Sequence, residues 1–253
     1  MAHPARIYDY WLGGKDNFAA DRIAAEEVLS VMPVMAQVAR SVRMFLAAVV
    51  HYLAADAGIR QFLDIGTGLP TANNTHEVAQ RAAPGSRIVY VDNDPIVLMH
   101  ARALLTSSRR GQCAYVDADA RDPASILAEA AETLDFTQPV AIMMLGLLHF
   151  IPDDDAPYAL TRYYLDALAP GSYLAISHAS SDIEAEPQEE AAKKYNSHSA
   201  TPITLRSGAE VARFLDGLDL IPPGITPLGQ WAPGVAAVGP AHLPTYTALA
   251  RKP

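Results

Sequence analysis

Gln61-Phe-Leu-Asp-Ile-Gly-Thr-Gly-Leu-Pro70 and Arg87-Ile-Val-Tyr-Val-Asp-Asn-Asp-Pro95 are the two stretches that decide the fold. The first is a short apolar strand that enters a tight glycine turn, and the second is an apolar strand that ends at an acidic residue. In a βαβ unit this arrangement builds a nucleotide site, because glycines let the backbone approach the ligand and the acid binds ribose hydroxyls.

Two residues of the first stretch indicate which nucleotide the turn favours. A dinucleotide fingerprint has a small residue at its third glycine position, where this chain has Thr71. Asp64, two residues before Gly66, would bring negative charge close to a pyrophosphate, but it suits a ligand with an ammonium or sulfonium group. Both residues argue against an NAD(P)-dependent oxidoreductase, as does the lack of a Tyr-x-x-x-Lys pair after residues 172–178, the fifth predicted strand.

The composition limits the partners. Half of the 253 residues are hydrophobic, which predicts a full core in one large domain or in a domain with a helical cap. The formal net charge is −9 and the basic residues form no cluster, since Arg109-Arg110 is only a pair. Nucleic acid is therefore not expected as a partner, because phosphate binding needs a basic surface. The longest apolar run, residues 140–151, is too short to cross a bilayer, so no membrane partner is expected.

Cysteine and histidine usage points to an ordinary cytoplasmic protein. Cys113 is the single cysteine, which fits a reducing cytoplasm and is expected to be a small hydrophobic residue of a strand. No signal peptide is visible. The eight histidines show no H-x-x-x-H or H-x-H spacing, so we expect no metal site.

Strands and helices alternate from residue 61 onward. The strands are continuous apolar runs, which is typical of parallel strands buried on both faces, so the sequence predicts a doubly wound α/β fold. The predicted strands are residues 61–65, 87–92, 113–117, 139–145 and 172–178, and the predicted helices are residues 74–83, 95–106, 123–131 and 154–168.

The two ends of the chain depart from this alternation. Residues 1–58 are expected to form an N-terminal flap and helical cap, with helices over 20–31 and 34–56, before a core over 59–253. Residues 1–18 are hard to place as a regular helix, because the pair Gly13-Gly14 is unfavourable inside one.

Beyond the fifth strand the chain has two further predicted helices. An exposed one covers residues 183–197, and Ser207 with Glu210 forms a capping box for another over 208–216. Residues 218–231 and 245–250 are then predicted to be a final antiparallel pair of strands.

Several segments, in chain order, resemble motifs of class I S-adenosylmethionine (SAM)-dependent methyltransferases. Asp64-Ile-Gly-Thr-Gly68 resembles their D/E-x-G-x-G motif, and Asp92 matches the acid at the end of their second strand. Their third-strand, post-strand-four and fifth-strand segments are matched by Tyr115-Val-Asp-Ala-Asp-Ala-Arg-Asp-Pro123, Leu145-Gly-Leu-Leu-His-Phe-Ile-Pro-Asp153 and Leu168-Ala-Pro-Gly-Ser-Tyr-Leu-Ala-Ile-Ser177.

The N-terminal sequence sharpens the resemblance. The segment from Pro4 to Arg22 is similar to the opening of an actinobacterial group of S-adenosyl methyltransferases, formerly a domain of unknown function. The resemblance covers nearly the whole chain. It implies a doubly wound, mostly parallel Rossmann-like methyltransferase sheet with an N-terminal helical cap, with S-adenosyl-L-methionine as cofactor and S-adenosyl-L-homocysteine (SAH) as product.

At the glycine turn the resemblance implies contacts with SAM. The Asp64 carboxylate can accept a hydrogen bond from the methionine ammonium, or it can stabilise the turn instead. A side chain within the turn would collide with the ligand, unless the turn only requires a positive φ. The residues of this turn are Gly66, Thr67 and Gly68.

The second strand is expected to bind the ribose. A carboxylate accepts from two hydroxyls at once, so Asp92 is assigned to the ribose and Asn93 to the edge of the adenine. Asp94 is the rival for the ribose, but its position before Pro95 is typical of a helix cap.

The third strand is expected to contact the adenine. Asp119 would accept from the adenine amino group, with the backbone of Ala120 nearby. Asp117 and Asp122 compete for this role, although Asp122 stands before Pro123 as a helix cap would.

The fourth strand is expected to border the reacting methyl group. Gly146 and His149 lie in the segment after it, and an imidazole there could deprotonate an acceptor or only pack against the ligand. His178, at the end of the fifth strand, is a weaker candidate for the same role.

The N-terminal flap carries four further candidates. Tyr8 and Trp11 could cover SAM, since aromatic faces suit a sulfonium, or they could only dock the N-terminus onto the core. Lys15 could pair with the methionine carboxylate, and Asn17 is also expected to face the cofactor.

The sequence thus predicts a SAM-dependent methyltransferase with an unidentified, small-molecule acceptor. The alternative is a SAM-binding sensor or regulatory module without methyl transfer. A homo-oligomer is compatible with the sequence.

Overall fold

One sheet holds all the strands of the described chain, and its centre is parallel. The computed structural model describes residues 1–97, 99, 111–230 and 243–253. The strands are β1 (Gln61–Ile65), β2 (Arg87–Asp92), β3 (Gln112–Asp117), β4 (Ala141–Leu145), β5 (Tyr173–Ala179), β6 (Asp219–Leu220), β7 (Thr226–Leu228) and β8 (Leu243–Arg251). Their order is β3-β2-β1-β4-β5-β8-β6, with β7 also paired to β8. The first five run parallel, and each lies within two residues of its predicted bounds.

The order of the strands reverses between β1 and β4, and this reversal positions a ligand site. From β1 the chain runs outward to β2 and β3, and it then returns to place β4 on the other side of β1. Ligands of open α/β sheets bind outside the carboxyl ends of the strands at such a switch point. The glycine turn after β1 therefore lies where a crevice is expected.

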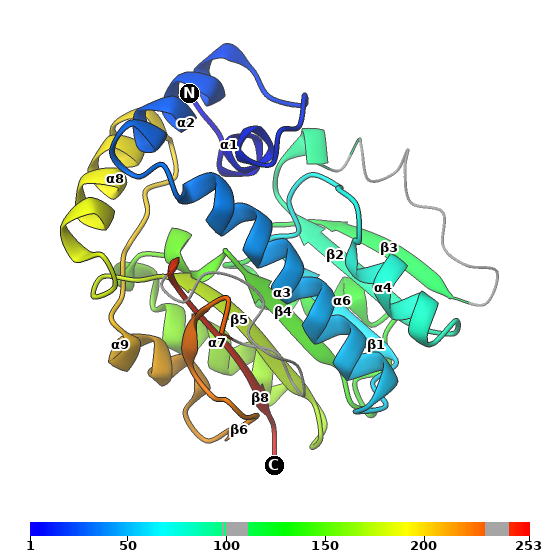
Figure 1. Cartoon of the computed structure of the whole chain (residues 1–253). Coiled ribbons are helices and arrows are strands. Elements are labelled where there is room, and N and C mark those ends of the chain that lie inside the picture. The colour runs from blue at the N-terminus through cyan, green and yellow to red at the C-terminus, as the bar shows by residue number, and fades with distance from the viewer. Residues whose placement is uncertain (98, 100–110, 231–242) are drawn as a thin grey trace.

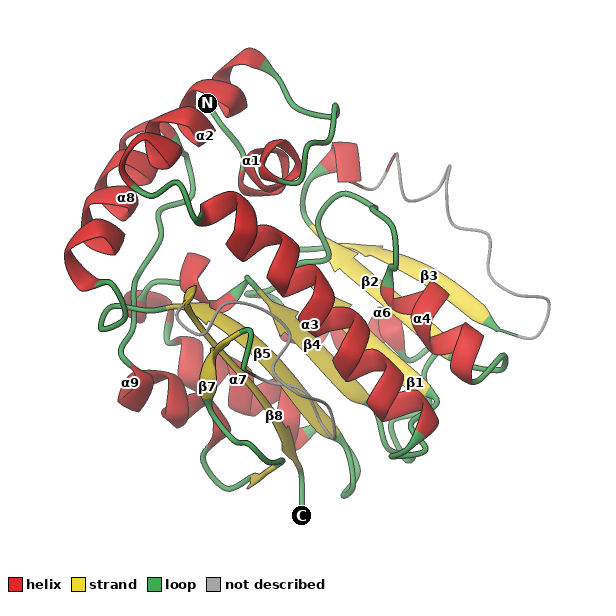
Figure 2. Ribbon diagram, in the orientation of Figure 1, coloured by secondary structure: helices red, strands yellow, loops and turns green. Residues whose placement is uncertain are grey.

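Helices cover both faces of the sheet (Figure 2). They are α1 (Pro4–Trp11), α2 (Ala19–Val31), α3 (Met35–Ala55), α4 (Thr75–Ala82), α6 (Pro123–Ala130), α7 (Pro157–Asp166), α8 (Ala185–His198) and α9 (Gly208–Ala212), with short 3-10 turns at Leu148–Phe150, Asp153–Asp155 and Arg213–Leu215. One core joins α3 and α4 to Phe62 and Ile88, and the opposite core joins α6 and α7 to Leu63 and Val89. Neighbouring residues of one strand thus serve opposite faces, as the continuous apolar runs predicted.

A third layer of helices lies over the carboxyl ends of the strands. Figure 1 shows α1, α2 and α8 grouped at that end of the sheet, next to the start of α3. Ile7, Val28 and Tyr195, one from each of these helices, share a buried apolar cluster. The predicted division into a cap over 1–58 and a core over 59–253 stays a prediction, although α3 itself packs against the sheet.

The N-terminal segment contains a helix that the sequence analysis did not expect. Helix α1 covers Pro4–Trp11 and begins with His3, whose ring accepts from the backbone N–H of Ala5. The glycine pair follows the helix, with Gly13 at a φ of 82°. The two glycines therefore end a short helix, where a positive φ is needed, and do not interrupt one.

Three other boundaries also differ from the prediction. The stretch 218–231 is not one strand, because β6 and β7 are separate short strands that both pair with β8. Helix α7 begins only at Pro157, since Ala156 adopts a left-handed conformation with a φ of 48° after the preceding turn. Helix α9 ends at Ala212 and continues as a 3-10 turn, while its capping box of Ser207 and Glu210 is confirmed.

Some expectations fall on parts of the chain outside the described residues. They are most of the helix predicted over 95–106, the pair Arg109-Arg110, and the end of the predicted strand at Trp231. Among the described helices, α3 is long and apolar enough to cross a membrane by length and composition, and 56% of its most apolar window is buried inside the protein.

Candidate functional site

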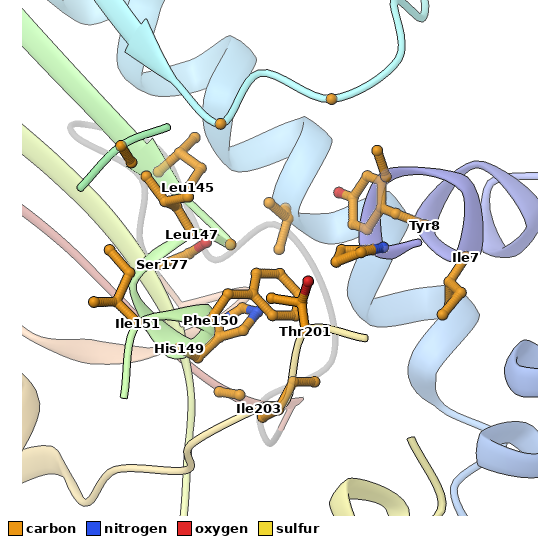
Figure 3. Close-up of a pocket in the computed structure, with 18 of the residues that line it drawn as sticks. Ile7, Tyr8, Leu145, Leu147, His149, Phe150, Ile151, Ser177, Thr201 and Ile203 are labelled. Atoms are coloured by element: carbon orange, nitrogen blue, oxygen red, sulfur yellow. The ribbon is translucent and has the colours of Figure 1, made fainter. Parts of the chain in front are cut away.

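A cavity of about 390 Å³ lies between the carboxyl ends of β1, β2, β4 and β5 and the helical layer above them. Figure 3 shows part of its lining, with Ile7 and Tyr8 of α1 facing the segment after β4. Its size is in the range of small-molecule sites. It brings together most of the residues that the sequence analysis selected, namely Tyr8, Asp64, Gly66, Thr67, Gly68, Asp92, Asn93, Asp119, Ala120, Gly146 and His149.

Lys15 and Asn17 are not brought to the cavity. Lys15 is exposed, and Asn17 is buried in a turn that folds around the carboxylate of Asp9. The Asn17 side-chain amide donates to Asp9 Oδ2 at 2.8 Å and to the backbone carbonyl of Gly14. A Cβ on Gly14 would lie 1.9 Å from Asp9 Oδ1, so this glycine is required by the turn itself.

The glycine turn after β1 is shaped by two different constraints. Gly66 and Gly68 both have positive φ, at 74° and 66°. A Cβ on Gly66 would lie 2.8 Å from the Leu147 side chain, whereas a Cβ on Gly68 would meet open space. Gly66 therefore allows the segment after β4 to approach β1, and Gly68 leaves room beside the cavity wall.

Asp64 is a buried carboxylate at the end of β1. Its Oδ2 accepts from the Thr75 hydroxyl at 2.6 Å, and the residue is 4% exposed. Burial raises the pKa of Asp64 to about 6, and the Thr75 hydrogen bond and the nearby Arg43 partly oppose this rise. An ionised Asp64 is thus costly in the protein alone, and a cationic ligand group would relieve the cost.

Asp92 closes β2 and faces the glycine turn. Its Oδ2 accepts from the backbone N–H of Gly68 at 2.8 Å, and its Oδ1 accepts from the backbone N–H of Asp94 at 2.9 Å. Burial raises the pKa of Asp92, and these two hydrogen bonds oppose the rise. The carboxylate is fixed at the point where β1 and β2 meet.

Asp94 and the N-terminus close the same end of β2. Asp94 Oδ1 accepts from the backbone N–H of Ile96, as a helix cap does, and its Oδ2 lies 2.9 Å from Arg6 Nη1. Arg6 also pairs with Asp21 of α2 at 3.1 Å. Through these ion pairs α1 and α2 are tied to the edge of the cavity.

Asp119 lies on the same side of the cavity, after β3. It forms a bidentate pair with Arg121, which also reaches Asp155 at 3.1 Å. These charges lower the pKa of Asp119, and Asn93 also donates to it. Asp122 lies outside the lining and caps α6 by accepting from the backbone N–H of Ser125.

Arg43 is a cavity residue that the sequence analysis missed. It lies on α3, and its Nη2 donates to the backbone carbonyls of Ala72 and Asn73. Its Nε is buried and has no hydrogen-bond partner among the described residues. No local motif marks this arginine, because it comes from a helix that precedes the glycine turn by about twenty positions.

The opposite side of the cavity is apolar. Leu145, Leu147, Phe150, Ile151 and Ile203 lie there, and the ring of Tyr8 faces them from α1, as Figure 3 shows. The Tyr8 hydroxyl donates to the backbone carbonyl of Ala39 at 2.8 Å, so only the ring is left for the cavity.

His149 lies in this apolar part. Its ring packs against Phe150, with centroids 4.3 Å apart, and a Cβ on Gly146 would lie 3.9 Å from its Cε1. Its Nδ1 is buried and, like the Ser177 hydroxyl, has no hydrogen-bond partner among the described residues. Burial, together with His178 and Arg206, lowers the pKa of His149 well below its ordinary value, so its imidazole is neutral near pH 7.

His178 has both ring nitrogens engaged. Its Nδ1 is 2.8 Å from the carbonyl oxygen of Ala179, and its Nε2 is 2.9 Å from Arg206 Nη1. The first contact requires the proton on Nδ1, so Nε2 accepts from the arginine. Burial lowers the pKa of His178 to about 4, and this histidine serves the framework of the site.

Arg206 holds the segment after β4 in place. It is 1% exposed, and its guanidinium donates to the backbone carbonyls of Leu148 and Ile151 at 3.0 and 2.9 Å. It also pairs with Asp153 at 2.6 Å and lies over the Phe214 ring. A fully buried arginine is rare, and here each arm of its fork meets an acceptor.

The described residues contain no group of three or more His, Cys, Asp or Glu side chains that could hold a metal ion. Cys113 of β3 is a free thiol, and burial raises its pKa to about 11.

Comparison with known proteins identifies the family. The family model described as S-adenosyl methyltransferase matches residues 1–253. A DUF574 family protein from Streptomyces avermitilis is 44% identical with a TM-score of 0.95, over 100% of this chain and 98% of its own. A candidate methyltransferase from Thermobifida fusca is 38% identical with a TM-score of 0.90, over 99% of this chain and 95% of its own.

A more distant structure shares the fold. The SAM-dependent methyltransferase from Anabaena variabilis is 13% identical with a TM-score of 0.56, over 83% of this chain and 86% of its own. The search of the curated proteins gave no match.

The chain therefore belongs to the S-adenosyl methyltransferase family. It is a methyltransferase with the Rossmann-like fold of these enzymes, and it uses SAM as cofactor and releases SAH.

Proposed function

We propose that this methyltransferase transfers the methyl group of SAM to a small-molecule acceptor bound in the cavity over β4 and β5. One observation carries the proposal. A single cavity has buried carboxylates, Asp64 and Asp92, on one side and an apolar wall with a neutral imidazole, His149, on the other. The first side suits a cationic nucleoside, and the second suits an organic acceptor.

The polar side fits SAM residue by residue. Asp64 would accept from the methionine ammonium, which offsets the cost of its buried charge. Asp92 would bind the ribose hydroxyls, and the open space at Gly68 lets the ligand approach the backbone of the turn 66–68. Asp119, Ala120 and Asn93 would border the adenine.

Arg43 is the better candidate for the methionine carboxylate. Its guanidinium lines the cavity near Asp64 and has an Nε without a partner among the described residues. A carboxylate that accepted from this Nε would sit beside an ammonium held by Asp64, which matches the amino-acid end of SAM. Lys15, by contrast, is exposed and outside the lining.

The apolar side would receive the acceptor. Bound SAM supplies an electrophilic methyl group on a sulfonium. The protein contributes orientation and a dry site: Gly146 borders the reacting position, and the Tyr8 ring with α1 covers it. Where the acceptor carries a proton, His149 is the residue that can take it at a ring nitrogen.

Calorimetric titration with SAM, SAH and NAD tests the first half of this proposal. Micromolar binding of the two adenosyl ligands and no binding of NAD are expected. Transfer of labelled methyl from SAM to a panel of small molecules then tests the second half. Binding without transfer to any acceptor, including proteins and nucleic acids, would favour the sensor alternative, which no present finding supports.

A further inference from the structure

The two sides of the cavity differ in charge, and this difference bears on the chemistry of the acceptor. The aspartate and arginine side chains of the described lining are Arg43, Asp64, Asp92, Asp119, Arg121 and Asp155. They lie at the ends of β1, β2 and β3, on the facing helix α3, or in the exposed pair of Arg121 and Asp155. The wall formed by residues 145–152, the end of β5 and residues 200–205 contributes none.

This uncharged wall contains two polar atoms that the protein leaves unused. None of the described residues hydrogen-bonds to Nδ1 of His149, which is buried, or to the buried hydroxyl of Ser177. Buried polar atoms are nearly always hydrogen-bonded, and an unsatisfied one costs about 1–3 kcal/mol. Figure 3 shows both residues on the same side of the cavity, among Leu147, Phe150 and Ile151.

The neighbouring His178 makes the contrast clear. Its two nitrogens are satisfied by Ala179 and Arg206, so its role is complete without a ligand. His149 lies 5.6 Å from it, ring to ring, and is the histidine of the pair that remains available. A neutral imidazole accepts one hydrogen bond and donates one, and it has no charge with which to hold an anion.

We infer that the acceptor is an uncharged, largely apolar molecule, oriented by one hydroxyl or N–H group that donates a hydrogen bond to the imidazole of His149. The inference rests on the proposed function, because it assumes that SAM occupies the polar side. A carboxylate or an ammonium ion would lose its hydration against this wall, whose lining side chains offer no opposite charge. The guanidinium of Arg206 lies behind the wall and is already paired with Asp153. The Ser177 hydroxyl, which can donate and accept, would bind a second polar atom of the same molecule.

Binding to the SAH-loaded protein tests the inference with three matched probes. They are 2-naphthol, 2-methylnaphthalene and 2-naphthoate, which share one ring system and differ in a neutral donor, a methyl group and a carboxylate. In equilibrium dialysis 2-naphthol should bind about tenfold more tightly than either of the others, which is the scale of one buried hydrogen bond. Equal or tighter binding of 2-naphthoate or 2-methylnaphthalene, or no binding of 2-naphthol, would overturn the inference.

A variant assigns the effect to one side chain. His149→Phe should weaken 2-naphthol about tenfold, to the level of 2-methylnaphthalene, whose own affinity should not change. His198→Phe, at an exposed position of α8, is the matched control and should change neither. An unchanged preference for 2-naphthol in a folded His149→Phe protein would contradict the role of this histidine.

SAH binding distinguishes a failure of the proposed function from a failure of the inference about the acceptor. It should be unaltered in His149→Phe, because this residue lies on the acceptor side. If wild-type protein failed to bind SAH, the proposed function itself would fail. If SAH bound and the three probes were not discriminated, only the inference about the acceptor would fall. If His149→Phe did not fold, the wild-type comparison of the three probes would still decide the question.

Discussion

The polar and apolar sides of the cavity are built in different ways. The polar side consists of the ends of β1, β2 and β3 and the short segments that directly follow them, with Asp64, Asp92 and Asp119 as their acidic residues. The apolar side combines α1, the segment after β4, the end of β5 and residues 200–205, which are far apart in the chain. A polar ligand is recognised by groups that parallel strands place at their ends, whereas an apolar ligand is recognised by a shape that only packing produces.

Arg206 gives the largest expected effect and tests whether the two sides are independent. Arg206→Met removes a buried guanidinium and leaves the carbonyls of Leu148 and Ile151 without their donor. The free energy of unfolding should fall by about 3–5 kcal/mol. SAH affinity should stay within about threefold of wild type, because the residues of the polar side do not contact this arginine. Chemical denaturation and calorimetry measure the two quantities.

Arg213 provides the matched control for that variant. It stacks on Tyr158, as Arg206 does, but it is exposed. Arg213→Met should therefore cost less than about 1 kcal/mol of stability. Loss of SAH binding in a folded Arg206→Met protein would show that the two sides are coupled through the segment after β4.

Asp92 gives the largest expected effect on the polar side. Asp92→Ala removes the carboxylate assigned to the ribose, and SAM and SAH should bind about 2–3 kcal/mol more weakly, the scale of lost charged hydrogen bonds. Asp117 is its register partner on β3, is exposed and does not line the cavity, so Asp117→Ala should leave the affinity unchanged. Unchanged SAM affinity in Asp92→Ala would mean that the ribose site is misassigned.

Replacing the charge of Asp64 should raise the stability of the folded protein and weaken the binding of SAM. Burial raises its pKa from 3.8 to about 6, so the folded protein binds this proton more tightly than the unfolded chain and loses stability as the pH rises from about 4 to above 6. Asp64→Asn keeps an acceptor for Thr75 without the charge. Its unfolding free energy at pH 7.5 should rise by about 1–2 kcal/mol, below the ceiling of about 3 kcal/mol set by the pKa change.

The same variant should lose affinity. Without the charge that pairs with the methionine ammonium, SAM should bind about tenfold more weakly at pH 7.5. In the wild type, SAM affinity should fall as the pH is lowered through about 6, where Asp64 becomes protonated. Denaturation and calorimetry at pH 5 and pH 7.5 check both effects. A destabilised Asp64→Asn protein with normal affinity would contradict the assignment.

The sequence predicts the polar side well because its signals are local. The strand at 61–65, its glycine turn and the acid at the end of β2 lie within one βαβ unit, and the strand bounds agree with the structure. The capping box of Ser207 and Glu210 is local in the same sense. The glycine pair after α1 was misjudged because it ends a helix that has only eight residues.

The framework of the apolar side could not be predicted in this way. Arg206 would be placed on the surface by its residue type, and its burial depends on carbonyls more than fifty residues earlier in the chain. Ser177 was read only as part of a strand motif, and nothing near it in sequence indicates an unpaired hydroxyl. The unsatisfied atoms are visible only after the packing of β4, β5 and residues 200–205 is known.

Arg43 gives the smallest expected effect, and it shares one property with each side of the cavity. It belongs to the polar side by chemistry, yet it comes from α3 and is not part of a local motif. Arg43→Gln should weaken SAM binding by about 1–1.5 kcal/mol, since one charge-assisted hydrogen bond to the carboxylate is lost. The exposed Arg40, three residues earlier on the same helix, is the matched control, and Arg40→Gln should change nothing. The decisive comparison uses 5′-methylthioadenosine, which lacks the amino-acid end of SAM. The affinity of 5′-methylthioadenosine should be equal in wild type and Arg43→Gln. A loss of affinity as large as that for SAM would mean that Arg43 supports the structure of the cavity and does not bind the methionine carboxylate.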